Sequence, residues 1–161
     1  MKYCFALATL CLLCFSACKP PHMDTYEKNI EIPGHSWTYD YKPTFEVDIQ
    51  PADTAFLYRV SVNVRHEDAY PFNNMWINLT TKLEGSKDSV SSRVNLPLAD
   101  AMGKWSGSGV DDIFEHRVQI LDNAVFDKPG KYKFTFEQKM RQNPLPHVMN
   151  VGLRIEKVSA R

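Results

Sequence analysis

The sequence predicts an all-β protein, an antiparallel β-sandwich with a jelly-roll-like arrangement in a single domain. Three observations support this. Several short segments alternate apolar and polar residues with a period of two, clusters of Pro, Gly, Asn and Asp separate them, and no window shows a capped helical stripe. The 161 residues are 43% hydrophobic and 12% aromatic, a length and composition suited to one packed domain.

The clearest strand is expected at 56–65. Every second residue from Phe56 to Val64 is apolar and should form a buried face, and the residues between them should form a face that is mostly exposed to solvent. Further strands are expected at 76–83, 90–98, 114–120, 132–140 and 151–155, with weaker candidates at 27–32 and 44–49. Turn-forming residues separate these strands at 70–74, 84–88, 127–131 and 143–146.

The first residues have the pattern of a secretory signal peptide. Lys2 supplies the positive charge, and residues 3–15 form an apolar stretch too short to span a membrane. Ser16-Ala17-Cys18 follows and resembles a lipobox, in which the cysteine receives lipid and becomes the first residue after cleavage. We therefore expect a lipoprotein signal peptide at 1–17, a lipidated tether at 18–25 and the β-sandwich domain at 26–161.

The cysteines support lipidation of Cys18. All four lie in the first 18 residues, and the remaining 143 residues contain none. Disulfides and thiolate metal sites are therefore excluded from the domain. An ordinary signal peptide ending in an accidental cysteine is the other interpretation, and it leaves the position of Cys18 unexplained. Two or more acyl chains would anchor the protein stably.

Charge argues against several partners. Lys2 is the only charged residue before Cys18, which leaves 18 basic and 19 acidic residues from there on, a net charge of −1. Such a chain has no basic face for nucleic acid and no polybasic membrane patch. Lys19 is not the Asp that marks inner-membrane retention, and no acidic cluster follows Cys18. We therefore expect the periplasmic face of the outer membrane.

One long connection, 99–112, is the candidate functional segment. It holds three glycines around a tryptophan, and long ordered loops on a rigid sandwich often carry function. We expect contacts with partner proteins through Gly103, Lys104, Trp105, Gly107, Gly109, Asp111 and Asp112.

Several motifs in this order resemble the gliding motility lipoprotein GldH family of Bacteroidetes. The Gly-rich run 103–109 followed by Asp111-Asp112-Ile113 is similar to its GKWxGxGxGD-type segment, and Tyr70-Pro71-Phe72-Asn73-Asn74 is similar to its YPYxN turn. Residues 138–141 resemble its QxMR motif, and residues 151–157 resemble its VGxRIEK ending.

The resemblance implies a function that composition does not show. Proteins of this family are lipoproteins of the gliding machinery, which is coupled to type IX secretion, and members also occur in bacteria not known to glide. The resemblance implies a non-catalytic protein that acts by contacting other envelope proteins of the gliding and secretion apparatus. It implies no cofactor beyond the covalent lipid on Cys18.

The residues alone also argue against catalysis. The five histidines are scattered without metal-ligand spacing, and we expect no metal site. His116 has the parity of a core residue, whereas His66-Glu67-Asp68 is interpreted as a solvated turn. Asp111 and Asp112 could ligate Ca²⁺ but fit turn chemistry better.

The alternative function is carbohydrate binding by exposed tryptophans, which stack on sugar rings. It requires two tryptophans side by side on one exposed face. Parity places Trp76 on the outer face of its strand, Trp37 is expected in the core, and Trp105 is expected to pack down and hold the glycine loop.

Overall fold

The computed structural model describes residues 23–161, so the predicted signal peptide, Cys18 and most of the predicted tether lie outside the described residues. Two short 3-10 helices occur, η2 (Pro33–His35) and η3 (Pro51–Ala55). The strands are β1 (Thr25–Glu31), β2 (Ser36–Trp37), β3 (Thr44–Ile49), β4 (Phe56–Glu67), β5 (Asn74–Leu83), β6 (Val90–Pro97), β7 (Ser108–Val110), β8 (Ile113–Ala124), β9 (Gly130–Gln138), β10 (Leu145–Pro146) and β11 (Val148–Ala160).

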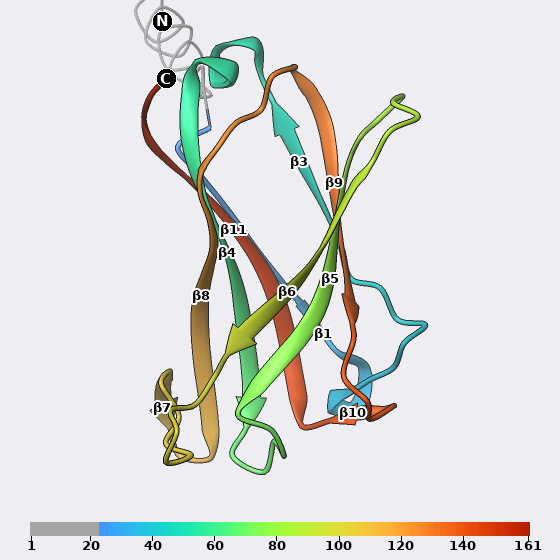
Figure 1. Ribbon diagram of the computed structural model, residues 1–161, viewed down its shortest axis with the longest axis vertical. Helices are drawn as coiled ribbons and strands as arrows, with labels where there is room; N and C mark the ends of the chain where they lie inside the picture. The colour runs from blue at the N-terminus through green and yellow to red at the C-terminus, as the bar shows by residue number, and fades with distance from the viewer. Residues whose placement is uncertain (1–22) are drawn as a thin grey trace, which may run out of the picture.

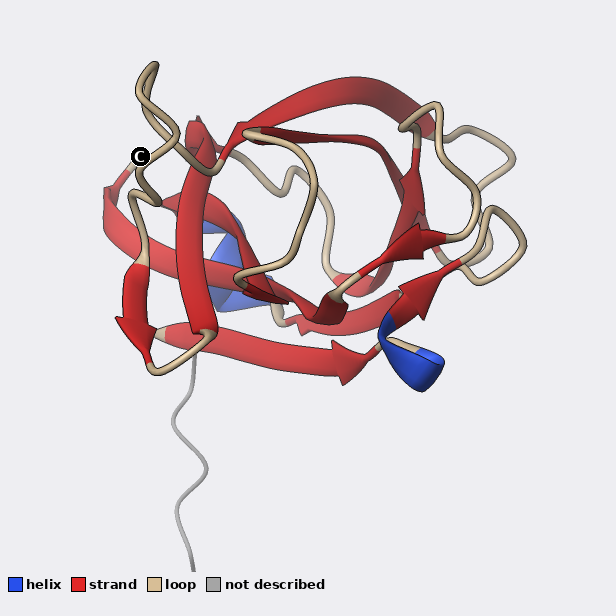
Figure 2. Ribbon diagram, turned by 90° about the horizontal axis from the view of Figure 1, so that it is seen from below, coloured by secondary structure: helices blue, strands red, loops and turns tan. Residues whose placement is uncertain are grey.

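These strands form two main antiparallel sheets. One has the order β1-β11-β4-β8-β7 and the other the order β3-β9-β5-β6, and a short β10-β2 pair closes one end (Figure 1). Viewed end-on, the strands curve around a common interior (Figure 2). The predicted all-β sandwich is confirmed.

The period-two pattern located the strands well. β3 has the predicted bounds, with Phe45, Val47 and Ile49 buried and the intervening residues exposed. β8 and β11 are longer than predicted, and the connection 99–112 contains the short strand β7. The largest fully buried side chains are Trp37, Tyr58, Phe45, Phe136, Ile32, Ile49, Met75, Ile77, Leu96, Leu98, Leu145 and Leu153.

The outer face of β4 differs from the prediction of a mostly wet surface. Ser61 and Asn63 are only 4% and 2% exposed. Asn63 lies opposite Gly152 on β11, and a Cβ at Gly152 would meet Asn29 Oδ1 at 1.8 Å. The missing side chain lets β1 reach across β11, so that Asn63 Nδ2 donates to Glu27 Oε1 at 2.7 Å and to Asn29 Oδ1 at 3.2 Å.

The two ends of the sandwich are formed by different segments of the chain. At one end the Met23 amide donates to the buried carboxylate of Asp53 at 2.6 Å, and the Arg161 amide donates to Ala55 O at 2.8 Å. Figure 1 shows the C-terminus at this end and β7 at the other. The twelve residues of β4 connect the two ends, a distance of about 36 Å. Within 23–161, no helix has the length and apolar character needed to cross a membrane.

Candidate functional site

The connection between β6 and β7 begins with a tight turn built by Asp100. The Oδ1 atom of Asp100 accepts hydrogen bonds from the amides of Met102 and Lys104, both at 2.9 Å. The Asp100 amide donates to Lys104 O at 2.9 Å, and Gly103 sits at φ +82°, a conformation that favours glycine. The tip of the loop is therefore ordered by its own hydrogen bonds.

Trp105 turns inward from this tip. Its indole Nε1 donates to Asp68 Oδ1 at 2.7 Å. The ring meets His66 edge-on with centroids 4.5 Å apart, and Phe114 is 5.9 Å away. A β-bridge between Ala99 and Trp105 fixes the backbone here. Trp105 thus packs down and holds the loop against the sheet, as its sequence context suggested.

The two following glycines allow β7 to lie close to β8. A Cβ at Gly107 would come within 2.3 Å of the Glu115 carbonyl oxygen and 2.8 Å of the His116 ring. A Cβ at Gly109 would come within 2.6 Å of the Phe114 ring. Both glycines are therefore explained by the packing of this hairpin.

Two buried histidines lie beneath the loop. The Nε2 atoms of His66 and His116 are 2.9 Å apart, and the rings are stacked with centroids 5.0 Å apart. His116 has the core position expected from its parity. The interpretation of His66 as part of a solvated turn is wrong: β4 continues through Glu67, and His66 is fully buried. Burial lowers the pKa of both rings, and the neighbouring His66 lowers that of His116 further.

Glu67 joins two more histidines at the same end of the sandwich. Its Oε1 lies 2.6 Å from His35 Nδ1 and its Oε2 lies 2.6 Å from His147 Nδ1. These hydrogen bonds, that from His147 first, lower the pKa of the Glu67 carboxyl. Glu67 therefore links the η2 segment to the turn between β10 and β11.

The two aspartates after β7 serve the turn into β8. Asp111 has φ +53°, and the carbonyl of Asp112 accepts a hydrogen bond from the Asp68 amide at 2.6 Å. Among residues 23–161, no group of three or more His, Cys, Asp or Glu side chains is arranged to hold a metal ion. The carboxylates of Asp111 and Asp112 are exposed, and the turn accounts for both positions.

The part of the loop that faces solvent differs from the part that packs. Met102 is 93% exposed and Val110 is 77% exposed, and Lys104 between them is exposed as well. Met102 and Val110 are the two most exposed large apolar side chains among residues 23–161, which makes this loop the candidate for partner contact. The sequence singled out Lys104 but not Met102 or Val110, and it gave no sign of Asp68 or Asp100.

The three tryptophans do not share one exposed face. Trp37 is buried in the core, and its Nε1 donates to Tyr41 O at 2.8 Å. Trp76 lies on the outer face of β5, as predicted, with the Arg93 guanidinium 4.9 Å from its ring centroid. Trp105 is packed against His66. The arrangement required by the carbohydrate-binding alternative is therefore not formed by the described tryptophans.

Comparison with known proteins agrees with the motifs in the sequence. A homolog of the gliding motility lipoprotein GldH from Christiangramia forsetii is 29% identical over 91% of this chain and 90% of its own length. The gliding motility lipoprotein GldH of Flavobacterium johnsoniae is 28% identical over 90% of each chain. Neither relative is named as an enzyme.

Among solved structures, a carbohydrate-binding module specific for non-crystalline cellulose aligns over 84% of this chain and 75% of its own, with 10% identity and a TM-score of 0.45. The profile of the GldH lipoprotein family matches residues 24–155, nearly the whole described domain. Given the match over that length and the two relatives, the chain belongs to the GldH lipoprotein family, which is implicated in gliding motility.

Proposed function

We propose that this lipoprotein is a non-catalytic accessory component of the gliding motility and type IX secretion machinery. It is held by lipid on Cys18 at the periplasmic face of the outer membrane and acts through protein–protein contacts of the exposed side of the 99–112 loop, which carries Met102 at the tip and Val110 in β7. The observation that carries the proposal is the exposure of Met102 and Val110 at the end of the sandwich remote from Met23.

The geometry supports this orientation. Five residue steps separate Cys18 from Met23, which span at most about 18 Å when fully extended. A lipid on Cys18 would therefore keep the Asp53 end near the membrane. The 99–112 loop lies about 36 Å further along β4, where a partner can reach it.

The loop tip can be tested without disturbing the packing beneath it. Met102 and Val110 are replaced together by serine in the chromosomal copy, and Trp105 and the two packed glycines are kept. We expect normal amounts of folded, lipidated protein with loss of colony spreading and of type IX cargo secretion. Ser108→Ala, an exposed change between the packed glycines, serves as the matched control.

A separate variant, Cys18→Ser, tests the anchor. We expect it to leave the membrane fraction and to lose function. Normal spreading and secretion by the Met102 and Val110 double variant, with the protein at wild-type level, would contradict the role of the loop tip. Retention of the Cys18→Ser protein in the membrane would contradict the anchor.

A further inference from the structure

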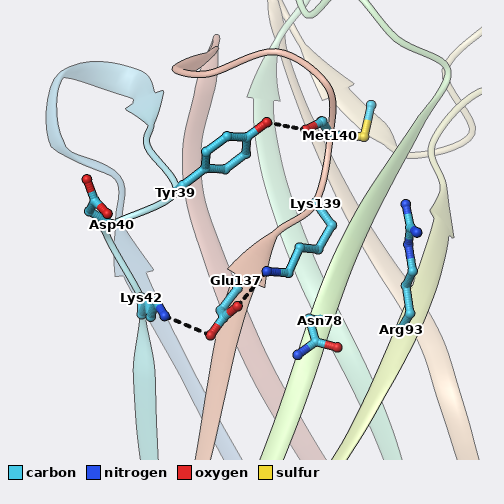
Figure 3. A pocket seen from close by; sticks show the side chains of 8 residues that line it. All are labelled: Tyr39, Asp40, Lys42, Asn78, Arg93, Glu137, Lys139 and Met140. Atoms are coloured by element: carbon cyan, nitrogen blue, oxygen red, sulfur yellow. Dashed lines mark hydrogen bonds and ion pairs between the residues drawn. The ribbon is translucent and has the colours of Figure 1, made fainter.

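A second surface feature lies on the outer face of the β3-β9-β5-β6 sheet. It is a groove of about 610 Å³, walled on one side by the connection between β2 and β3 (Figure 3). The residues that line it are Tyr39, Asp40, Lys42, Asn78, Arg93, Glu137, Lys139 and Met140. We call it the sheet groove.

The floor of the sheet groove is a row across three strands. Asn78 on β5 lies opposite Glu137 on β9 and Arg93 on β6. Glu137 is held by two lysines, Lys42 Nζ at 2.9 Å and Lys139 Nζ at 2.7 Å (Figure 3). One carboxylate therefore positions two ammonium groups, each of which keeps N–H donors for a further acceptor.

Of the three cations that line the sheet groove, Lys42 and Lys139 are paired with Glu137, whereas Arg93 has no carboxylate within ion-pair distance among residues 23–161. Its guanidinium lies over the Trp76 ring at 4.9 Å, which orients it. Arg93 also lines an adjacent hollow of about 270 Å³ together with Phe72, Trp76 and Arg141. The planar guanidinium matches a carboxylate in geometry and can donate two parallel hydrogen bonds to it.

The sheet groove and the adjacent hollow together carry a net positive charge, unlike the whole chain. Lys42, Arg93, Lys139 and Arg141 supply four positive charges, whereas Asp40 and Glu137 supply two negative ones, an excess of +2. The whole chain has a net charge of 0. The local excess indicates an anionic ligand.

The apolar groups favour a protein as the ligand. Tyr39, Phe72, Trp76 and Met140 lie beside the cations. Tyr, Trp, Phe, Met and Arg are the residues enriched at the centres of protein interfaces, where a few of them carry most of the binding energy. A purely electrostatic site for a small anion would have no need of them.

We propose that the sheet groove binds an acidic segment of a partner protein, with Arg93 taking one carboxylate and the Lys42–Lys139 pair another. Glu137 competes with the ligand for these lysines and thereby weakens binding. This surface is separate from the 99–112 loop and does not depend on its role, so the two proposals fail independently.

The test uses the full-length lipoprotein in neutral detergent and a fluorescently labelled oligoglutamate peptide, with binding followed by anisotropy. Arg93→Gln and Lys139→Gln should each weaken binding by about five- to tenfold. Glu137→Gln should strengthen it by about threefold, because it removes the competing charge. Lys87→Gln, the same charge change on the exposed turn between β5 and β6, should leave binding unchanged.

Raising the salt concentration should weaken the wild-type complex and reduce the difference between wild type and Arg93→Gln. The proposal is overturned if the peptide does not bind, if Arg93→Gln and Lys87→Gln behave alike, or if Glu137→Gln weakens binding. Tighter binding of polygalacturonate than of oligoglutamate at equal carboxylate concentration would also overturn it, in favour of an acidic glycan. Unchanged thermal unfolding of each variant confirms that the fold is intact.

Discussion

His66 and His116 face each other in the interior beneath the Trp105 loop, with their Nε2 atoms 2.9 Å apart. At that distance one ring donates an N–H and the other, which must be neutral, accepts it. His66 Nδ1 lies 2.7 Å from Glu67 O, so that nitrogen is satisfied as well. The contact beneath the loop therefore needs at least one uncharged imidazole, and burial disfavours the charged form of both rings.

This pair predicts a pH dependence of stability. Burial lowers the pKa of both histidines in the folded protein below the ordinary value near 6.5. As the pH falls below about 6.5, the unfolded chain takes up protons that the folded chain does not, so the free energy of unfolding decreases. We expect the urea midpoint to fall progressively from pH 6.5 to pH 5.

The Glu67 carboxyl does not change the predicted pH dependence of stability between pH 6.5 and pH 5. Its pKa is lowered in the folded protein, so its contribution is present above the ordinary value near 4.5 and is lost only below it. Replacing both histidines by glutamine should flatten the profile between pH 6.5 and pH 5. A wild-type midpoint that stays constant over this range would contradict the interpretation.

Gly107, just before β7, and Gly109 within it should tolerate alanine to different extents. In Gly107→Ala the new Cβ meets a backbone carbonyl at 2.3 Å, which cannot yield without moving the strand, and we expect a loss of about 2–3 kcal/mol. In Gly109→Ala the Cβ meets the Phe114 ring, which can rotate, and we expect about 1 kcal/mol. Chemical denaturation measures both, with Ser108→Ala as the neutral control. Equal losses, or none, would refute the close-approach explanation.

The contact between Trp105 and Asp68 can be isolated by a double-mutant cycle. Trp105→Phe keeps a ring but removes the indole N–H that Asp68 accepts at 2.7 Å, so we expect a loss of about 1 kcal/mol. Asp68→Ala should cost a similar amount, and the double variant should cost less than the sum. Strict additivity would mean that the hydrogen bond contributes nothing. Trp105→Ala, which also loses the packing on His66, should cost about 2–4 kcal/mol.

The hydrogen bonds on the outer face of β4 predict that replacing the Glu27 carboxylate lowers the free energy of unfolding. Glu27 is partly buried, which opposes ionisation, yet hydrogen bonds from Asn63, Arg154 and Arg117 keep its pKa below the ordinary value. We expect Glu27→Gln to destabilise the fold by about 1–2 kcal/mol because it removes the negative charge between Arg117 and Arg154, of which only Arg154 has a second carboxylate partner, Glu156. Glu31→Gln, on the same strand and exposed, is the control. Equal stability of the two variants would show that the network is solvated.

Period-two alternation was sufficient to predict the sandwich, because a strand with one buried face must place its apolar residues at every second position. It located β3 at 44–49 and placed Trp76 on an outer face. His66 continues the parity of Val62 and Val64, so the signal for its burial was present, but the adjacent acidic residues suggested a turn instead.

Other features depend on contacts that no local pattern contains. The burial of Asn63 requires Gly152 on β11 to leave space for side chains from β1. The meeting of His66 and His116 depends on the register between β4 and β8. The sequence predicted the 99–112 loop as a candidate site, which stays a prediction. It could not separate the packed Trp105 from the exposed Met102, since both are large apolar residues on one Gly-rich loop.

The most direct test of the account is photo-crosslinking in living cells from position 102 at the loop tip, with position 87 on the exposed turn between β5 and β6 as the comparison. If the loop tip is the contact surface, position 102 should yield a defined adduct with an envelope protein of the motility or secretion apparatus, and position 87 should not. Absence of an adduct at position 102, or the same adducts from both positions, would contradict it.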